Sequence, residues 1–319
     1  MSFSAAMKDD LARLTSHKDC CRLAEFAALT RFLGSIRIGG GQKTSLLLAT
    51  EHPAVARKIF SLAKELFRME TEITVHRKDR LRKNQVFSLC MPAQEPLEKA
   101  LFALGFARED EPQRIDFSAR PPRQFLDSPC CRRTYLRGAF LAAGSVNAPE
   151  GAYHMELICH GKEQAFFLRE LLQAFEIGAH IFRRKQAWVV YLKGSEHIAT
   201  FLTVVGSHRA LLEFENARVS KDMRNYLNRR VNSEAANIGK QVEAAQKQLR
   251  DIGVIDAGGR FAKLPRILRE AAEARLENPE CSLAELAQIL GVGKSGVNHR
   301  FRRLAEIAEQ INSGNHGVF

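Results

Sequence analysis

The hydrophobic and polar positions of the chain follow two kinds of pattern, and each predicts a different kind of element. Ile73-Thr74-Val75 alternates as a half-exposed strand does, whereas Val55, Ile59 and Leu62 recur with helical spacing. From Asn216 onward the strand pattern stops and only helical patterns follow. The sequence therefore predicts a mixed α and β region followed by an all-helical region.

The mixed region contains the same set of elements twice. Cys20-Cys21-Arg22 recurs as Cys130-Cys131-Arg132, and Gly34-Ser35-Ile36 recurs as Gly144-Ser145-Val146, both at an offset of 110 residues. Each set reads helix, hairpin, helix, hairpin, helix. The predicted elements of the first set are Leu23–Leu33, a strand pair ending at Leu46–Thr50, Pro53–Phe67, the strands Glu72–Arg77 and Val86–Met91, and a helix ending at Gly105; those of the second are Tyr135–Ala143, a strand pair ending at Tyr153–Cys159, Lys162–Phe175, the strands His180–Arg184 and Trp188–Lys193, and a helix ending at Gly206. A repeat of this length indicates a duplicated domain, because solenoid repeats are shorter.

The opening helix of each set is rich in small residues and ends in Gly-Ser. Small residues let two backbones approach closely. We therefore expect these two helices to pack on a pseudo-two-fold axis and the hairpins to form one continuous saddle. The predicted fold class is α+β, a saddle of two αββαββα halves followed by an all-α helix-turn-helix domain.

The all-helical region ends in a helix-turn-helix signature. Before it, the pattern predicts a basic helix over Arg218–Arg230, a second helix over Glu234–Arg250 capped by Asn232 or Ser233, and a third from Pro265 to Leu276. Ser282 then caps a short helix in which small Ala287 permits a close crossing, Gly291 makes a tight turn, and Val297 fills the gap between the helices. This combination of spacings is typical of helix-turn-helix geometry, although an ordinary αα-corner shares part of it.

The last helix predicts a polar and basic outer face. Ser295, His299 and Arg302 point away from Val297, with Asn298 and Arg303 on the flanks. Arg300 lies nearer the core, so we expect it to contact a phosphate or to have a structural role. Glu306 also faces outward and is expected to lie beyond the DNA groove. The candidate DNA-binding residues are Lys294, Ser295, Asn298, His299, Arg300, Arg302 and Arg303.

Charge strengthens this interpretation. The chain carries 48 basic and 36 acidic residues, a net charge of +12, which favours a polyanionic partner. A second basic run lies in the longer hairpin of the first half, and we expect its bases to make auxiliary DNA contacts: Arg77, Lys78, Arg80, Arg82 and Lys83. The 45% apolar share excludes wholesale disorder. Neither a membrane span nor a signal peptide is indicated, so we expect a cytoplasmic protein without membrane partners.

Two stretches resemble the signature helices of the LAGLIDADG homing endonucleases: Leu136-Arg137-Gly138-Ala139-Phe140-Leu141-Ala142-Ala143-Gly144 and, less closely, Phe26-Ala27-Ala28-Leu29-Thr30-Arg31-Phe32-Leu33-Gly34. In that family the residue before the terminal glycine is an acid that holds the catalytic metals. Here Leu33 and Ala143 stand at those positions, and alkyl side chains cannot ligate Mg²⁺. We therefore expect no catalytic residue and no catalytic metal. Glu25 and Glu156 are interpreted as surface or hairpin carboxylates.

The cysteines allow two interpretations. None of the seven forms a C-x-x-C pair, so neither a disulfide framework nor a zinc ribbon is indicated. If the opening helices pack together, Cys20, Cys21, Cys130 and Cys131 could approach one another and bind a metal. Adjacent cysteines on a helix point about 100° apart, however, and each pair would chelate poorly. We favour buried small hydrophobes, and so expect neither a metal nor a cofactor.

Three stretches together resemble the WhiA family over nearly the whole chain: Tyr135-Leu136-Arg137-Gly138-Ala139-Phe140-Leu141, Asn225-Tyr226-Leu227-Asn228-Arg229-Arg230-Val231-Asn232-Ser233-Glu234-Ala235-Ala236-Asn237, and Lys294-Ser295-Gly296-Val297-Asn298-His299-Arg300. The resemblance implies a bacterial, nucleoid-associated DNA-binding regulator of cell division and chromosome segregation, and of sporulation in some lineages. It also implies that the protein is not an enzyme and that double-stranded DNA is its main partner. The domains expected are two LAGLIDADG-like halves (1–110 and 111–217), a basic linker helix (218–233) and a helix-turn-helix domain (234–319).

Two other functions remain open from the residues. One is an active homing endonuclease with an appended DNA-binding module, which would need the two missing acids. The other makes the saddle a platform for other regulatory proteins, with DNA left to the helix-turn-helix domain. This last function is compatible with DNA binding by the same chain.

Overall fold

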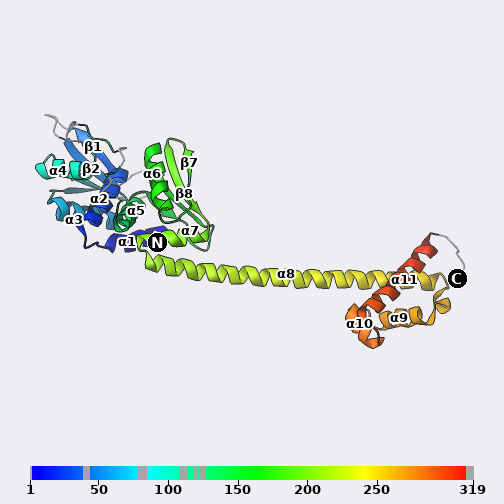
Figure 1. The fold of residues 1–319 in the computed structure, drawn as a ribbon. Helices are drawn as coiled ribbons and strands as arrows, with labels where there is room; N and C mark the ends of the chain where they lie inside the picture. Colours follow the sequence, from blue (N-terminus) through cyan, green and yellow to red (C-terminus); the bar gives the residue numbers. More distant parts are fainter. Residues whose placement is uncertain are drawn as a thin grey trace. The chain divides into compact units, whose positions relative to one another are not determined.

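The chain folds into two compact units, Met1–Asp222 and Met223–Phe319. The computed structural model describes residues 2–38, 44–77, 85–107, 114–117, 121–122, 125 and 127–313. The first unit combines helices with strands, and the second is helical (Figure 1).

The first unit consists of two halves with the same order of elements. The first half contains α2 (Asp19–Leu33), β1 (Gly34–Ile38), β2 (Thr44–Thr50), α3 (Pro53–Phe67), β3 (Glu72–Arg77), β4 (Gln85–Met91) and α4 (Glu95–Ala103); the second contains α5 (Pro129–Ala143), β5 (Gly144–Val146), β6 (His154–Cys159), α6 (Lys162–Gln173), β7 (His180–Arg184), β8 (Ala187–Lys193) and α7 (Ser195–Val205). The predicted αββαββα order of each half is confirmed. The pattern succeeded because hairpins and helices alternate here with little irregular chain between them.

Each half has its own antiparallel sheet, with strand orders β1-β2-β4-β3 and β5-β6-β8-β7. The first strand of each sheet starts at a glycine, and the two glycines are equivalent in the repeat. Gly34 pairs with Leu48 of β2, and Gly144 pairs with Leu157 of β6. Among the described strands, hydrogen bonds join only strands of the same half. The expected single continuous saddle is therefore wrong in this respect. The halves are joined by helix packing rather than by strand pairing, with α2 and α5 between the two sheets (Figure 1).

Helices α2 and α5 cross at two small residues that are equivalent in the repeat, Ala28 and Gly138. A Cβ atom built on Gly138 would lie 2.6 Å from the carbonyl oxygen of Glu25 and 2.9 Å from the Cβ of Ala28. Real Cβ atoms do not approach backbone this closely, so only glycine permits this crossing. The expected packing of the two opening helices is confirmed.

Gly138→Ala is expected to destabilise the first unit by roughly 1–3 kcal/mol, because the added methyl group overpacks a backbone contact that cannot move aside. Trp188, in β8, is the only tryptophan of the chain, so its fluorescence during denaturant unfolding reports on this unit. Gly239→Ala is the matched control, since a Cβ there meets nothing within 4 Å. Equal stability of Gly138→Ala and the wild type would show that α2 and α5 do not cross as described.

Helix α1 (Phe3–Arg13) was not foreseen from the sequence. Ser2 caps it by accepting a hydrogen bond from the backbone N–H of Ala5 at 3.2 Å, and Met7 and Leu11 are buried. The helix packs against α3 and α5. Only two of its side chains are fully buried, which is too weak a periodic signal to identify a helix from sequence alone.

Helix α8 (His208–Ala257) begins in the first unit and ends in the second. The predicted helix boundary at Asn232 and Ser233 is wrong, because the helix runs through both residues. Good helix formers surround them, and Arg230 pairs with Glu234 at 3.0 Å across the same turn. Residues 222–244 are all exposed.

The second unit has its own small hydrophobic core. Its elements after α8 are the 3₁₀ helix η3 (Phe261–Lys263), α9 (Arg266–Glu277), α10 (Leu283–Ile289) and α11 (Lys294–Asn312). Ile252 and Ile255, near the end of α8, join Leu286, Val297 and Phe301 in this core. The predicted helix pair that follows Ser282 is confirmed.

Candidate nucleic-acid interface

Helices α10 and α11 form the predicted helix-turn-helix pair. Ser282 begins α10 with a capping box: its hydroxyl accepts from the N–H of Glu285 at 3.3 Å, and its own N–H donates to the Glu285 carboxylate at 2.7 Å. Gly291 in the turn has φ +64°, a left-handed conformation that favours glycine. Ala287 and Val297 are buried where the two helices meet. The structural roles predicted for these residues from their spacing are thus confirmed: Ser282 as the cap, Gly291 as the turn residue, and Ala287 and Val297 as the residues packed between the helices.

Arg275, near the end of α9, supports this pair from inside the core, and sequence reasoning missed it. Its side chain is 1% exposed, donates to Oε1 of Gln248 at 3.0 Å and to the carbonyl oxygens of Asn278 and Cys281, and lies 5.5 Å from the ring of Phe301. Burial lowers the pKa of this guanidinium. The contacts hold the α9–α10 loop and α11 together. An arginine amid helical apolar spacing resembles a surface residue in sequence, so no signal distinguished it.

The outer face of α11 is polar and basic. Val297, Phe301 and Leu304 are buried against the unit's core. Six of the seven candidate residues are exposed, while Arg300 is half-buried, as expected for a side chain at the core edge. The exposed six are Lys294, Ser295, Asn298, His299, Arg302 and Arg303. The structure therefore brings the candidate residues together on a single helix.

Glu306 makes contacts that its sequence position did not reveal. Its carboxylate lies 3.6 Å from Nε of Arg302 and 2.7 Å from a terminal nitrogen of Arg303. All three side chains are substantially exposed, and exposed pairs contribute only about 0–1 kcal/mol. A phosphate group could displace this carboxylate, so Glu306 is a weak competitor for the two arginines.

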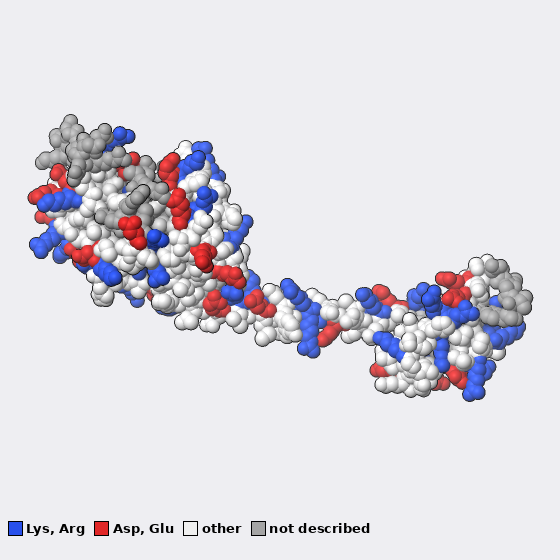
Figure 2. Space-filling view, viewed as in Figure 1, with Lys and Arg blue, Asp and Glu red and all other residues white. Residues whose placement is uncertain are grey.

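Basic side chains also occur outside α11. Figure 2 shows Lys and Arg side chains over both units, with a group of them on the helical second unit. Arg77, at the end of edge strand β3, is exposed. The other four bases of that hairpin, Lys78, Arg80, Arg82 and Lys83, lie outside the described residues.

The two signature helices end without acids. Leu33 and Ala143 are the last residues of α2 and α5, and each is followed by the glycine that begins a strand. An alkyl side chain therefore stands at each position that the resemblance to the homing endonucleases assigns to a metal-binding acid. Neither side chain offers an oxygen to a divalent metal.

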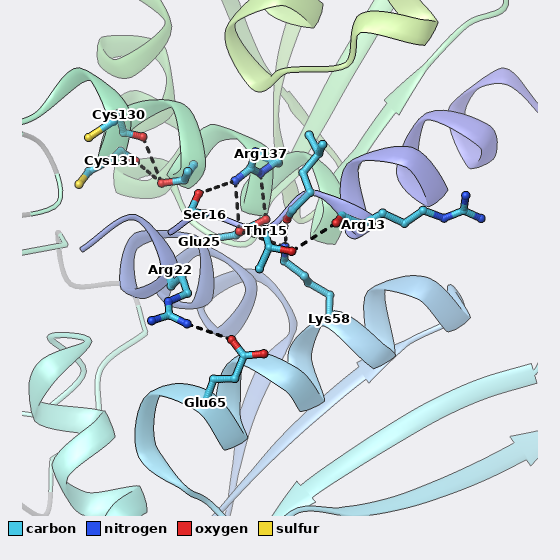
Figure 3. Close-up of polar contacts among 12 residues, drawn as sticks. Arg13, Thr15, Ser16, Arg22, Glu25, Lys58, Glu65, Cys130, Cys131 and Arg137 are labelled. Atoms are coloured by element: carbon cyan, nitrogen blue, oxygen red, sulfur yellow. Dashed lines mark hydrogen bonds and ion pairs between the residues drawn. The ribbon is translucent and has the colours of Figure 1, made fainter. Parts of the chain in front are cut away.

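Glu25, the acid that lies within α2, is part of a buried ionic network (Figure 3). Its Oε1 lies 3.0 Å from Nε of Arg137, and its Oε2 lies 3.4 Å from Nζ of Lys58. The side chain of Glu25 is 0% exposed. Its interpretation as a surface or hairpin carboxylate is therefore wrong, because the close crossing of α5 over α2 encloses it and brings Arg137 to it.

The network leaves Glu25 no free role as a metal ligand. Two cations already surround the carboxylate, and Arg137 also donates to Oγ of Ser16 at 3.2 Å. Burial lowers the pKa of Lys58, while the adjacent Glu25 carboxylate opposes that shift. In contrast, Glu156 is the hairpin carboxylate that the sequence predicts: it lies in β6 and pairs with Arg184 at 3.1 Å.

No helix within the described ranges combines the length and the apolar character that crossing a membrane requires. Even α8, with 50 residues, carries charged side chains throughout its length.

Models of one protein family match three consecutive parts of the chain. The WhiA N-terminal LAGLIDADG-like domain matches residues 19–106, the WhiA LAGLIDADG-like domain matches residues 132–224, and the WhiA C-terminal HTH domain matches residues 227–308. The fold class is thereby confirmed as two LAGLIDADG-like domains followed by a helix-turn-helix domain.

Relatives and solved structures agree with these matches. The "Probable cell division protein WhiA" of Desulforamulus reducens is 49% identical and covers 98% of this chain and 97% of its own; that of Heliobacterium modesticaldum is 48% identical, with the same coverage. The crystal structure of full-length WhiA from Thermatoga maritima is 24% identical, with a TM-score of 0.60 over 97% of this chain and 99% of that one, and so shares the fold. Because the relatives exceed two-fifths identity over nearly the entire length, the chain belongs to the WhiA family.

Proposed function

We propose that this protein is a non-enzymatic DNA-binding regulator that reads duplex DNA with α11. The observation that carries the proposal is the outer face of α11, where Lys294, Arg302 and Arg303 stand beside Asn298 and His299, all exposed. Lysine and arginine side chains neutralise DNA phosphates. The amide of asparagine and the guanidinium of arginine can also form hydrogen bonds with the edges of nucleotide bases in the major groove. The helix-turn-helix family match and the net charge of +12 support the same function.

The cellular role proposed is transcription regulation in cell division. It rests on the relatives, which are named as cell division proteins. Roles in chromosome segregation and, in some lineages, sporulation follow from the family resemblance, as does association with the nucleoid. We further propose that the bases of the Arg77–Lys83 hairpin make auxiliary contacts with DNA. The proposed domains end at residues 110, 217 and 233, and the helix-turn-helix domain follows.

We also propose that the LAGLIDADG-like unit does not cut DNA. Purified protein is expected to leave supercoiled plasmid and genomic fragments intact with Mg²⁺ or Mn²⁺ at any protein concentration, since Leu33 and Ala143 supply no metal ligand and Glu25 is held by two cations. Agarose-gel cleavage assays measure this. Site-specific, metal-dependent nicking that copurifies with the protein through stringent steps would contradict it.

A salt titration with two opposite variants tests the DNA-binding face. Arg303→Ala removes one phosphate contact, so it should weaken binding to all duplexes similarly and flatten the slope of log affinity against log salt by about one. Glu306→Gln should raise the affinity for all duplexes by up to about fivefold, because it removes the carboxylate that forms exposed ion pairs with Arg302 and Arg303.

The control is Lys99→Ala, which removes an exposed base of α4 that pairs with Glu95. It should bind DNA as the wild type does. If Arg303→Ala and Glu306→Gln also leave affinity and salt slope unchanged, α11 does not contact DNA and the proposed function of this face is wrong.

A further inference from the structure

Four cysteine thiols gather where α2 and α5 begin. The Sγ atoms of Cys20, Cys21 and Cys131 all lie within 4.8 Å of one another. Cys130, the residue before Cys131, is close enough for its thiol to interact electrostatically with that of Cys21. The pairs Cys20 with Cys131 and Cys21 with Cys130 exchange under the 110-residue repeat, so the cluster has the symmetry of the helix pair. All seven cysteines of the chain are free thiols.

Adjacent cysteines on one helix diverge, so either pair alone would chelate a metal poorly. In the structure, however, Cys20 and Cys21 of α2 and Cys131 of α5 have their sulfur atoms within 4.8 Å of one another, and Cys130 precedes Cys131 in α5. Cys21 and Cys131 are 4% and 1% exposed, whereas Cys20 is exposed. Two cysteines of the cluster are thus buried, while exposed Cys20 and half-buried Cys130 give an ion a way in.

The position of the cluster at two helix N-termini suits negatively charged ligands. Both cysteine pairs occupy the second and third positions of their helices, and neither helix has a side-chain N-cap. Backbone N–H groups and the positive end of a helix dipole stabilise negative charge at such positions. The Oγ atom of Ser128 lies 2.8 Å from Sγ of Cys130, so its hydroxyl can donate to a thiolate there. Metal binding displaces the thiol protons.

We propose that Cys20, Cys21, Cys130 and Cys131 bind one thiophilic divalent cation, Zn²⁺, and that this ion joins α2 to α5. Four thiolates without an open coordination position make a structural zinc site, and Zn–S bonds of about 2.3 Å require sulfur separations that a small closure of this cluster provides. Binding releases up to four thiol protons and leaves a site of charge −2. The two helix N-termini and the nearby Lys18 offset this charge. Because the ion ties the two halves together, it should stabilise the first unit in proportion to its occupancy.

The test is a titration of the reduced, full-length protein with Co²⁺ and Zn²⁺. Co²⁺ should produce the near-ultraviolet thiolate charge-transfer band and the visible bands of tetrahedral cobalt, saturating at one ion per chain, and Zn²⁺ should abolish both. Cys20→Ser and Cys130→Ser should weaken zinc affinity more than about 100-fold, since losing a ligand costs more than losing one of its supporting contacts. Cys90→Ser and Cys281→Ser, which alter half-buried cysteines outside the cluster, should bind as the wild type does.

Stability supplies a second readout that does not depend on the bands. Zn²⁺ should raise the midpoint of the unfolding transition reported by Trp188 in the wild type but not in Cys20→Ser, whose exposed position makes it tolerant of substitution. Folded, reduced wild-type protein that takes up neither ion would overturn the proposal. Wild-type affinity in both Cys20→Ser and Cys130→Ser, or isolation of the native protein with a Cys20–Cys131 disulfide in place of the ion, would overturn it equally.

Discussion

Glu25→Ala is expected to destabilise the first unit by roughly 3–5 kcal/mol, because it leaves two buried cations without their carboxylate. The side chains of Lys58 and Arg137 are only 6% and 10% exposed, so water cannot replace the lost partner. The lost contacts join α2 to α5 across the two halves and α2 to α3 within the first half. The measurement is denaturant unfolding of the full-length protein followed by the fluorescence of Trp188.

Two further variants make this expectation specific. Glu25→Gln keeps a hydrogen-bond acceptor and loses only the charge, so it should fall between the wild type and Glu25→Ala. Glu95→Ala removes the exposed pair with Lys99 and should leave the transition unchanged, since exposed pairs contribute little. A Glu25→Ala protein that unfolds at the wild-type denaturant concentration would show that the buried network does not hold the halves together.

Asn298→Ala and Arg302→Ala are each expected to cost roughly 1–3 kcal/mol in binding to a preferred duplex and little in binding to a scrambled one. The two residues lie one helical turn apart on the exposed face of α11, where the side chains of a helix in the major groove meet base edges. If the two losses add, the double variant should lose roughly 2–6 kcal/mol, or between about 30-fold and about 20,000-fold in affinity for the preferred site. Duplexes recovered from a random pool by the wild-type protein supply the preferred site.

The pattern of loss distinguishes base contacts from phosphate contacts. A base contact is lost only on the preferred duplex, whereas a phosphate contact such as that proposed for Arg303 is lost on every duplex. If Asn298→Ala and Arg302→Ala bind both duplexes as the wild type does, while alanine substitutions in Arg77–Lys83 abolish binding, then the first unit reads DNA and the assignment is reversed.

Local periodicity predicted the elements of the first unit well, because strands and helices here satisfy their own hydrophobic patterns. Glu72–Arg77 and His180–Arg184 have the predicted bounds, and Pro53–Phe67 forms α3 as expected. The helix-turn-helix pair could be predicted equally well, because Ser282, Gly291 and Val297 each have a local role, as a cap, a tight turn and a filler between the helices.

Features set by contacts between distant residues could not be predicted in this way. Glu25 is ordinary in sequence and becomes a buried ion-pair partner only when α5 crosses α2 at Gly138. Asn232 and Ser233 carry a real capping preference, but a strong helical context on both sides outweighs it. The approach of thiols from two helices was foreseen as a consequence of helix packing, but the divergence of adjacent cysteines on one helix favoured the other interpretation, and only the structure gives the distances between the sulfur atoms.

Genome-wide crosslinking of the protein to DNA in cells, comparing the wild type with the Asn298→Ala/Arg302→Ala double variant, measures whether α11 directs the protein to its sites. We expect discrete binding sites that share a sequence in the wild type, and their loss in the double variant at equal protein level. The same discrete sites in the double variant, or their absence in the wild type, would contradict the claim that α11 directs this protein to DNA.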